Sequence, residues 1–337
     1  MKRLLLSLVA LATMLFPARA QEVFRLGIIG LDTSHSVRFS ELLNAPDSDD
    51  PIVQRFEVVA AYPYGTTTIE SAASRIPKYI EEVQKYGVKV VGSIQEVLEA
   101  ADGIFIETND GRLHLEQAIE VFKSGKPVFI DKPMGATLGE TIAIFKMAEK
   151  YGVKTFSSSA LRFAKQNQEL RKGSYGEVQG ADCYSPHSPE PTHPDFGYYG
   201  IHGVETLYTV MGTGCEKVCR MHGSDGDIVT GLWKSDRLGS FRAIVGGAYI
   251  YGGNAFFKKG PAVPVGGYEG YKPLLDAILT FFDDGVLPVS PEETIEIFAF
   301  MKASNMSLER GGKYVTIAEA MKLGEKDAKK LIKKYDK

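Results

Sequence analysis

The chain has 337 residues, of which 44% are hydrophobic and 24% are charged, as is ordinary for a globular protein. A formal net charge of −3 leaves no basic surface of the kind that binds nucleic acid. The length exceeds that of one ordinary hydrophobic core and predicts two domains. Because the charge argues against nucleic acid, we expect a small-molecule ligand.

The first 20 residues have the pattern of a secretory signal peptide. Lys2 and Arg3 precede an apolar stretch from Leu4 to Phe16, which is too short to span a bilayer comfortably. Ala18 and Ala20 place small residues before a cleavage point at Gln21. We therefore predict a periplasmic or secreted mature protein with no membrane segment.

Residues 21–157 alternate between short β-branched runs and helical patterns. This alternation predicts a Rossmann-like, doubly wound parallel sheet with helices on both faces. The expected strands are 24–30, 56–61, 89–91, 103–106, 127–130 and 154–156, and the expected helices are 36–43, 71–86, 94–100, 114–124 and 139–151.

Residues 158–337 have a different texture, with strand-like runs that follow one another without helices between them. This pattern predicts an α+β domain with a large open, mainly antiparallel sheet. Strands are expected at 178–184, 228–233 and 240–245, and helices at 166–172, 271–283 and 292–309. Cys183, Cys215 and Cys219 match no metal or redox motif, and buried free thiols are favoured over one disulfide.

The first strand ends in a turn, Gly30-Leu31-Asp32-Thr33-Ser34-His35, at the place where dinucleotide folds carry a glycine fingerprint. Gly30 keeps the first glycine, whereas Asp32 and His35 replace the second and third. Thr33, Ser34 and the helix N–H groups could still hold an anion. Alternatively, Asp32 or Ser34 caps the helix, or Asp32, His35 and Glu107 form a polar or metal-binding set.

Two further segments carry residue types suited to catalysis. Lys132 follows the fifth strand, and the carboxyl ends of parallel strands face the ligand crevice. His202 lies at the start of a helix that runs to Met211, and imidazole suits proton transfer near neutral pH. Glu205 follows one turn later and could orient the imidazole.

A proline-rich loop over residues 186–195 precedes that helix. His187, Glu190, His193 and Asp195 are metal-ligand types, but their spacing matches no metal motif, and no metal is predicted. Tyr198, Tyr199 and Trp233 suit sugar stacking, although aromatic packing in the core is the commoner role.

Together these motifs resemble the Gfo/Idh/MocA (glucose-fructose oxidoreductase-like) family. Asp131-Lys132-Pro133 is similar to its Glu-Lys-Pro motif, and Gly200-Ile201-His202 with Glu205 to its later helix. Leu161-Arg162-Phe163 resembles the entry into its second domain. The resemblance implies carbohydrate or cyclitol substrates, NAD or NADP, Lys132 as the group that polarises a substrate hydroxyl, and His202 as the acid/base.

The chain departs from that family pattern on the cofactor side. Besides the altered turn, Tyr62-Pro63-Tyr64 supplies no ribose-binding acid after the second strand. Tyr198 replaces an aspartate, and Glu107-Thr108-Asn109-Asp110 replaces a small residue and a proline. One hypothesis is therefore an oxidoreductase-family enzyme on a sugar derivative with tightly bound NAD(P). The other is a cofactor-free carbohydrate-binding protein, lyase or hydrolase.

The predicted site residues fall into three groups, and an open sheet in the second domain predicts a homodimer or homotetramer. The expected catalytic residues are Lys132 and His202; the cofactor-binding residues are Gly30, Asp32, Thr33, Ser34, His35, Thr108 and Asn109; and the substrate-binding residues are Tyr198, Tyr199, Glu205, His193 and Arg162.

Overall fold

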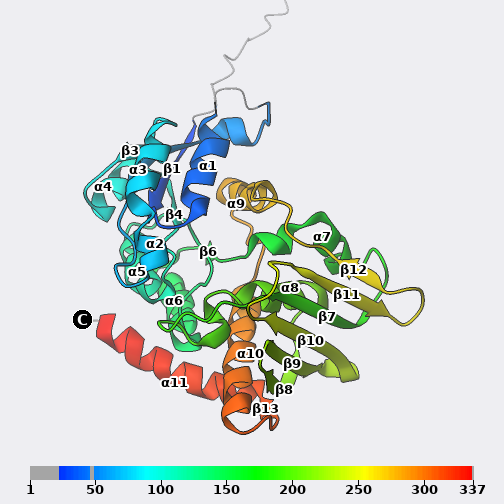
Figure 1. The fold of residues 1–337 in the computed structure, drawn as a ribbon. Coiled ribbons are helices and arrows are strands. Elements are labelled where there is room, and N and C mark those ends of the chain that lie inside the picture. Colours follow the sequence, from blue (N-terminus) through cyan, green and yellow to red (C-terminus); the bar gives the residue numbers. More distant parts are fainter. Residues whose placement is uncertain (1–22, 46–48, 336–337) are drawn as a thin grey trace, which may run out of the picture.

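The computed structural model describes residues 23–45 and 49–335, which fold around two sheets (Figure 1). The predicted signal peptide lies outside the described residues. The first sheet has six strands in the order β3-β2-β1-β4-β5-β6, and all its pairings are parallel. The strands are β1 (Phe24–Ile29), β2 (Phe56–Tyr62), β3 (Lys89–Val90), β4 (Gly103–Ile106), β5 (Val128–Ile130) and β6 (Thr155–Phe156). This confirms the predicted Rossmann-like sheet.

Alternate side chains of these strands pack on opposite faces of the sheet, as the two-residue period of a strand requires. Ile104 and Ile106 pack against the helices on one face of the sheet, and Phe105 packs on the other face. The first face is covered by α4 (Ile94–Ala100), α5 (Gly111–Lys123) and α6 (Leu138–Tyr151), and the second by α1 (Ser34–Asn44), α3 (Ile76–Gln84) and α9 (Lys272–Asp284).

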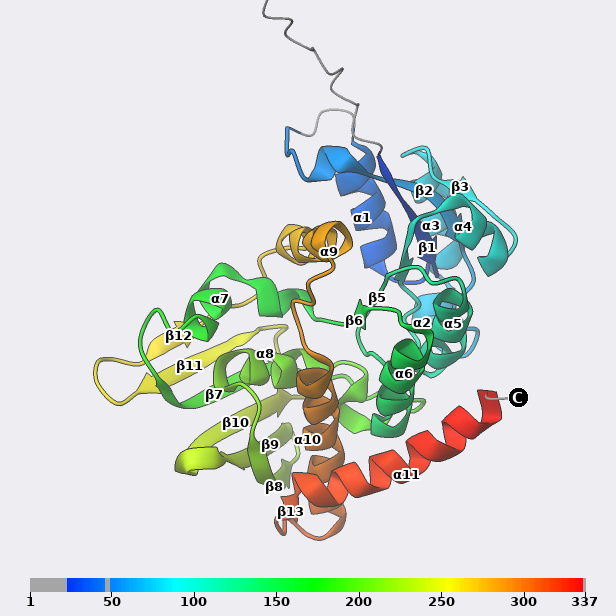
Figure 2. The same cartoon turned by 180° about the vertical axis from the view of Figure 1, so that it is seen from behind.

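Helix α9 comes from the C-terminal part of the chain but belongs to the core of the first sheet. Leu274, Ile278 and Phe282 on this helix pack with Leu26 and Phe105. Figure 2 shows α9 beside α1, on the side of the first sheet that faces the rest of the C-terminal part. The helix therefore packs on one face of the first sheet and connects the two parts of the chain.

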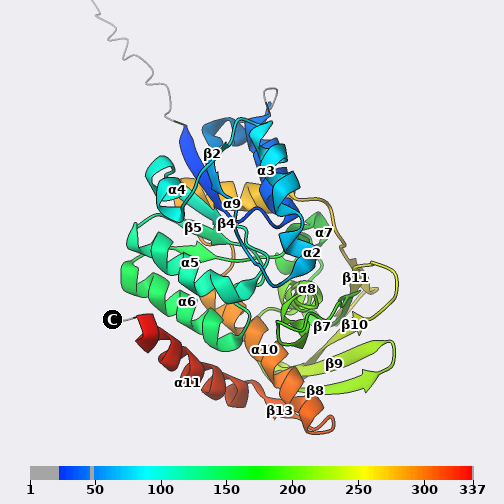
Figure 3. The ribbon, with the colours of Figure 1, turned by 60° about the vertical axis from the view of Figure 1, so that its left-hand side comes forward.

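The last helix, α11 (Ile317–Tyr335), also returns to the first part of the chain and lies alongside α6 (Figure 3). Gly324 permits this close approach, because a Cβ atom there would lie 2.5 Å from Leu138 Cγ. The predicted boundary between residues 157 and 158 thus separates the two sheets, while α9 and α11 pack back across it.

The second sheet has seven strands in the order β12-β11-β7-β10-β9-β8-β13. Only β7 and β10 pair in parallel, so the sheet is mainly antiparallel, as predicted. Its strands are β7 (Val178–Pro186), β8 (Cys215–Gly223), β9 (Gly226–Trp233), β10 (Arg237–Ile244), β11 (Gly252–Phe257), β12 (Val263–Val265) and β13 (Val315–Thr316). The helices that accompany it are α7 (Lys165–Arg171), α8 (Ile201–Met211) and α10 (Pro291–Glu309).

The helix expected over residues 71–86 is in fact two helices, α2 (Glu70–Ala73) and α3. Pro77 stands in the first turn of α3, where its missing N–H is harmless, whereas a continuous helix would place it in the interior. The three cysteines are free, as predicted, with Cys183 and Cys215 buried. Within the described ranges, no helix combines the length and apolar character that crossing a membrane requires.

Candidate active site

A pocket of about 580 Å³ lies where the carboxyl ends of the parallel strands face the second sheet. Strand ends, the start of α1 and the start of α8 contribute to it, as in the ligand crevice of other open α/β sheets. The lining residues are Thr33, Ser34, His35, Ser71, Arg75, Asn109, Asp131, Lys132, Ser159, Ala160, Leu161, Ser188, Tyr198, Tyr199, His202, Tyr249, Tyr251, Tyr268 and Tyr271.

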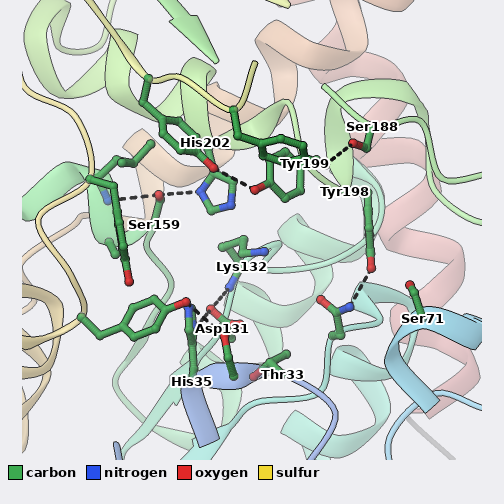
Figure 4. Close-up of a pocket in the computed structure, with 18 of the residues that line it drawn as sticks. Thr33, His35, Ser71, Asp131, Lys132, Ser159, Ser188, Tyr198, Tyr199 and His202 are labelled. Atoms are coloured by element: carbon green, nitrogen blue, oxygen red, sulfur yellow. Dashed lines mark hydrogen bonds and ion pairs between the residues drawn. The ribbon is translucent and has the colours of Figure 1, made fainter. Parts of the chain in front are cut away.

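The structure brings Lys132 and His202 together in this pocket, although 69 positions separate them in the sequence. Figure 4 shows Lys132 in the middle of the pocket, between His202 on one side and Asp131 on the other. The ammonium lies 6.0 Å from the centre of the Tyr199 ring. The pocket therefore offers a ligand both a proton donor, the Lys132 ammonium, and a proton acceptor, the His202 imidazole.

The imidazole of His202 is held from behind by Ser159. Its Nδ1 atom lies 2.7 Å from Ser159 Oγ, which also accepts a hydrogen bond from Leu161 N. Burial and, next, the positive charge of Lys132 hold the pKa of His202 well below its ordinary value of 6.5. The ring is consequently neutral at neutral pH, which is the state from which it can accept a proton.

Glu205 and Arg162, both predicted to contact the substrate, lie behind the pocket wall in a buried ion-pair network. Arg162 Nε donates to Glu205 at 2.7 Å, and Arg162 Nη1 donates to Glu293 at 2.7 Å. Glu205 also accepts hydrogen bonds from Ser158 Oγ and Ser159 N. Glu205 therefore does not orient His202 directly; it fixes the backbone of Ser159, which contacts His202.

Asp32 is fully buried in the turn after β1, and its carboxylate is bonded to the backbone of two other loops. Its two carboxylate oxygens accept bonds from Thr66 N at 3.0 Å and Asn109 N at 2.8 Å. A Cβ atom on Gly65 would lie 2.2 Å from the same carboxylate, so the loop after β2 packs directly onto it. The carboxylate thus stands where the second glycine of a dinucleotide fingerprint would leave space for a pyrophosphate.

The loop that covers Asp32 is itself tied to the segment after β4. Thr66 Oγ1 donates to Asp110 at 2.9 Å, and Arg112 bonds both Asp110 and Thr68. A dinucleotide would have to break these contacts and bring its phosphates against a buried carboxylate. The residues of the turn therefore do not fit the pyrophosphate of NAD or NADP.

The other residues predicted to bind a cofactor divide into two groups. Gly30 and Thr108 lie beneath the turn, where a Cβ atom at Gly30 would be 2.6 Å from Thr108 N. Thr33, Ser34 and Asn109 line the pocket. Asn109 Nδ2 donates to the hydroxyl of Tyr198 at 2.6 Å, which links the end of β4 to the segment before α8.

Replacing Asp32 by asparagine should destabilise the protein, because an amide N–H₂ would then face one of two backbone donors. We expect the free energy of unfolding to fall by about 1–3 kcal/mol, as for other buried groups that lose a partner. Urea denaturation would measure the change, with Asp327→Asn on the exposed face of α11 as the control. Equal stability of the Asp32 variant and the control would contradict the proposed packing of the turn.

His193, predicted to bind substrate, lies outside the pocket lining and ties the proline-rich loop to α5. Its Nε2 atom accepts a hydrogen bond from Gly111 N at 3.2 Å, and its Nδ1 atom lies 3.0 Å from Thr192 Oγ1. His187 instead pairs with Asp195 at 3.0 Å. The potential metal ligands of this loop therefore each contact a different structural partner and do not gather around one point.

Because burial lowers the pKa of His193 to about 4, its protonation opposes folding. The stabilising contribution of the neutral ring is complete above about pH 6.5 and is lost as the pH falls from 6.5 to 4. We expect a loss of roughly 3 kcal/mol from this group over that range. Urea denaturation of His193→Gln and the unmodified protein should show their stability difference shifting by this amount, and a constant difference would contradict it.

Three buried ionisable groups meet at the bottom of the pocket, after β4, after β5 and in α1. His35 Nδ1 lies 3.0 Å from Asp131 Oδ1 and 3.6 Å from Glu107 Oε2. Burial lowers the pKa of His35, but the charges and hydrogen bonds of Asp131 and Glu107 together outweigh it and raise the pKa to about 10. Burial, together with the charge of Asp131, raises the pKa of Glu107 above its ordinary value. Asp131 takes the place that Asp32 was expected to have in this set.

Sequence reasoning missed a group of tyrosines in the wall of the pocket. Tyr249, Tyr251, Tyr268 and Tyr271 line it, and Tyr251 OH lies 2.8 Å from Tyr199 OH. Their density over residues 249–271 was the available signal. Trp233, considered for sugar stacking, is fully buried in the core, where its indole N–H donates to Gly212 O.

Comparison with family models gives a match over residues 24–159 to the GFO_IDH_MocA model, described as an oxidoreductase family with an NAD-binding Rossmann fold. Residues 24–159 form a domain of the Gfo/Idh/MocA family. This confirms the resemblance drawn from Lys132 and its neighbours. No curated protein has a significantly similar sequence.

Solved structures of Gfo/Idh/MocA-type dehydrogenases share the fold of most of this chain. A probable dehydrogenase from Thermotoga maritima matches with a TM-score of 0.72 and 20% identity, covering 88% of this chain and 100% of that one. Scyllo-inositol dehydrogenase from Lactobacillus casei, solved with NAD(H) and scyllo-inositol, gives 0.69 and 15%, with coverage of 88% and 100%. The WlbA dehydrogenase from Bordetella pertussis, solved with NADH and UDP-GlcNAcA, gives 0.65 and 18%, with coverage of 88% and 99%. At these identities the likeness establishes the fold alone.

Proposed function

We propose that this protein is a non-redox lyase or hydrolase that acts on a sugar derivative through Lys132 and His202. The observation that carries this proposal is the shared pocket of these two residues, next to a turn in which a buried Asp32 carboxylate stands at the second glycine position of a dinucleotide fingerprint. The dehydrogenases of the same fold that were solved with scyllo-inositol and with UDP-GlcNAcA support a polyhydroxylated ligand.

A reaction without a hydride acceptor limits the kinds of substrate that can lose a proton. Without oxidation in the same site, a C–H bond is acidic enough only beside a carbonyl or carboxylate group that the substrate already carries. Neutral His202 takes this proton, and the C–H electron pair moves to the carbonyl oxygen as an enolate that the Lys132 ammonium stabilises. Collapse of the enolate expels the oxygen substituent on the next carbon, which leaves with a proton from the imidazolium. This completes a lyase reaction, and addition of water to the new double bond would complete a hydrolase reaction.

Deuterium exchange tests this function without knowledge of the final product. The protein is incubated in D₂O with a 3-keto-glucoside, with a uronic acid and with the parent glucoside, and proton NMR follows the carbon next to the carbonyl. We expect protein-dependent loss of that proton signal only in the first two. Exchange in none of them, combined with oxidation of the parent glucoside in the presence of NAD, would support the dehydrogenase alternative instead.

We also propose that the mature protein is exported and assembles through the open face of its second sheet. The N-terminal pattern of residues 1–20 supports export. The register places Leu238 and Phe256 on either side of Gly180, and both side chains are exposed. A second copy would cover these apolar side chains. Light scattering should give a dimer or tetramer, and a charged Leu238→Glu variant should favour the monomer.

A further inference from the structure

We infer that His35, Glu107 and Asp131 form a binding site for a divalent metal ion at the bottom of the pocket. The three residues come from the start of α1 and from the ends of β4 and β5, so the fold itself brings them together. One ligand atom from each lies within 4.8 Å of the others. This inference does not depend on the proposed reaction.

The spacing of the candidate ligand atoms suits a small divalent ion. His35 Nδ1 is 3.0 Å from Asp131 Oδ1 and 3.6 Å from Glu107 Oε2. Two ligands that each lie about 2.1 Å from a shared ion are separated by roughly 3.0–3.5 Å in tetrahedral or octahedral geometry. Little movement of these side chains is therefore needed to enclose an ion.

A second, independent observation is that buried carboxylate oxygens of this cluster have no hydrogen bond beyond their ion pairs with His35. These are both oxygens of Glu107 and Oδ2 of Asp131, whereas Asp131 Oδ1 accepts from Lys132 N at 2.8 Å. Glu107 and Asp131 are each fully buried. Buried carboxylates normally have partners or coordinate metals, because an unsatisfied one is costly.

The donor set indicates the class of ion. One imidazole nitrogen with two carboxylates suits Mn²⁺, Fe²⁺ or Zn²⁺, whereas Ca²⁺ and Mg²⁺ prefer all-oxygen sites. His35 and Asp131 both line the pocket. An ion held by them would keep coordination positions open toward the pocket, where hydroxyl or carbonyl oxygens of a ligand could bind.

Competing with this inference is an ion pair in which a protonated His35 alone neutralises the carboxylates. Titration of chelator-treated protein with MnCl₂, ZnCl₂ and CoCl₂ distinguishes the two. We expect one equivalent of metal per chain by calorimetry, and at least about 100-fold weaker binding by His35→Asn and Glu107→Gln. His222→Asn and Glu190→Gln, which lie outside the cluster, should bind as the unmodified protein does.

The unmodified protein decides the question even if the variants fail to fold. Bound Co²⁺ should give visible d–d absorption that excess Zn²⁺ abolishes, and EDTA should lower the thermal midpoint in a manner that Mn²⁺ or Zn²⁺ reverses. Folded protein that takes up none of the three ions at a tenfold molar excess would overturn the inference. Equal uptake by the cluster variants and the controls would overturn it as well.

Discussion

Replacing Arg162 by methionine is expected to lower the free energy of unfolding by about 3–5 kcal/mol, the largest stability effect that we predict. Arg162 is almost fully buried and bonds Glu205 and Glu293, which are also buried. Methionine fills a similar space but leaves the Glu205 carboxylate without its positive partner. Desolvation of an unpaired charge, rather than loss of packing, is the reason for the size of the effect.

Urea denaturation measures this change, and an ion pair at the surface provides the control. Arg310 pairs with Glu319, with 43% of each side chain exposed. Because water replaces that partner readily, Arg310→Met should leave the unfolding midpoint unchanged within experimental error. Loss of stability that is no greater in Arg162→Met than in Arg310→Met would contradict the network described behind the pocket.

Replacing His202 by alanine is expected to lower the rate of proton exchange on the keto-sugar by about 10²–10⁴-fold. Affinity for the ligand should change little, because the hydroxyl and tyrosine groups that line the pocket remain. His222→Ala, in an exposed position on β8, is the control. Parallel loss of affinity and rate would mean that His202 serves binding and not proton transfer.

Lys132→Met should affect the same reaction in a second way. The charge of Lys132 helps to hold the pKa of His202 low, after burial. Its removal should raise the imidazole pKa toward 6.5, and NMR titration of the His202 ring would follow this directly. An unchanged imidazole pKa would show that the ammonium does not face His202 in solution.

Sequence patterns were sufficient for the parts of the site that depend on local order along the chain. Lys132 follows a buried strand of a parallel sheet, so its place at the crevice follows from topology. His202 lies at the start of a helix that follows glycine and aromatic residues. The family resemblance then predicted that Lys132 and His202 share one site. The two sheets were predictable because alternating and successive strand patterns differ in kind.

The missed features all depend on contacts between distant segments. Asp32 was expected to face a cofactor, but donors from Thr66 and Asn109 turn its carboxylate inward. Glu205 lies one turn from His202, yet Arg162 offers a charge that a neutral imidazole cannot match. Tyr271 reaches the start of α1 because α9 packs across the first sheet, which helix periodicity alone does not reveal.

The dinucleotide content of the purified protein tests the account most directly. Protein is denatured in acid, the released nucleotides are quantified by absorbance and mass spectrometry, and native protein is titrated with NAD and NADP by calorimetry. Because a buried Asp32 carboxylate stands at the second glycine position of the turn, which a pyrophosphate must approach, we predict no stoichiometric release and no binding of either nucleotide. Release of NAD(H) or NADP(H) near one equivalent per chain would contradict the account and restore a dehydrogenase.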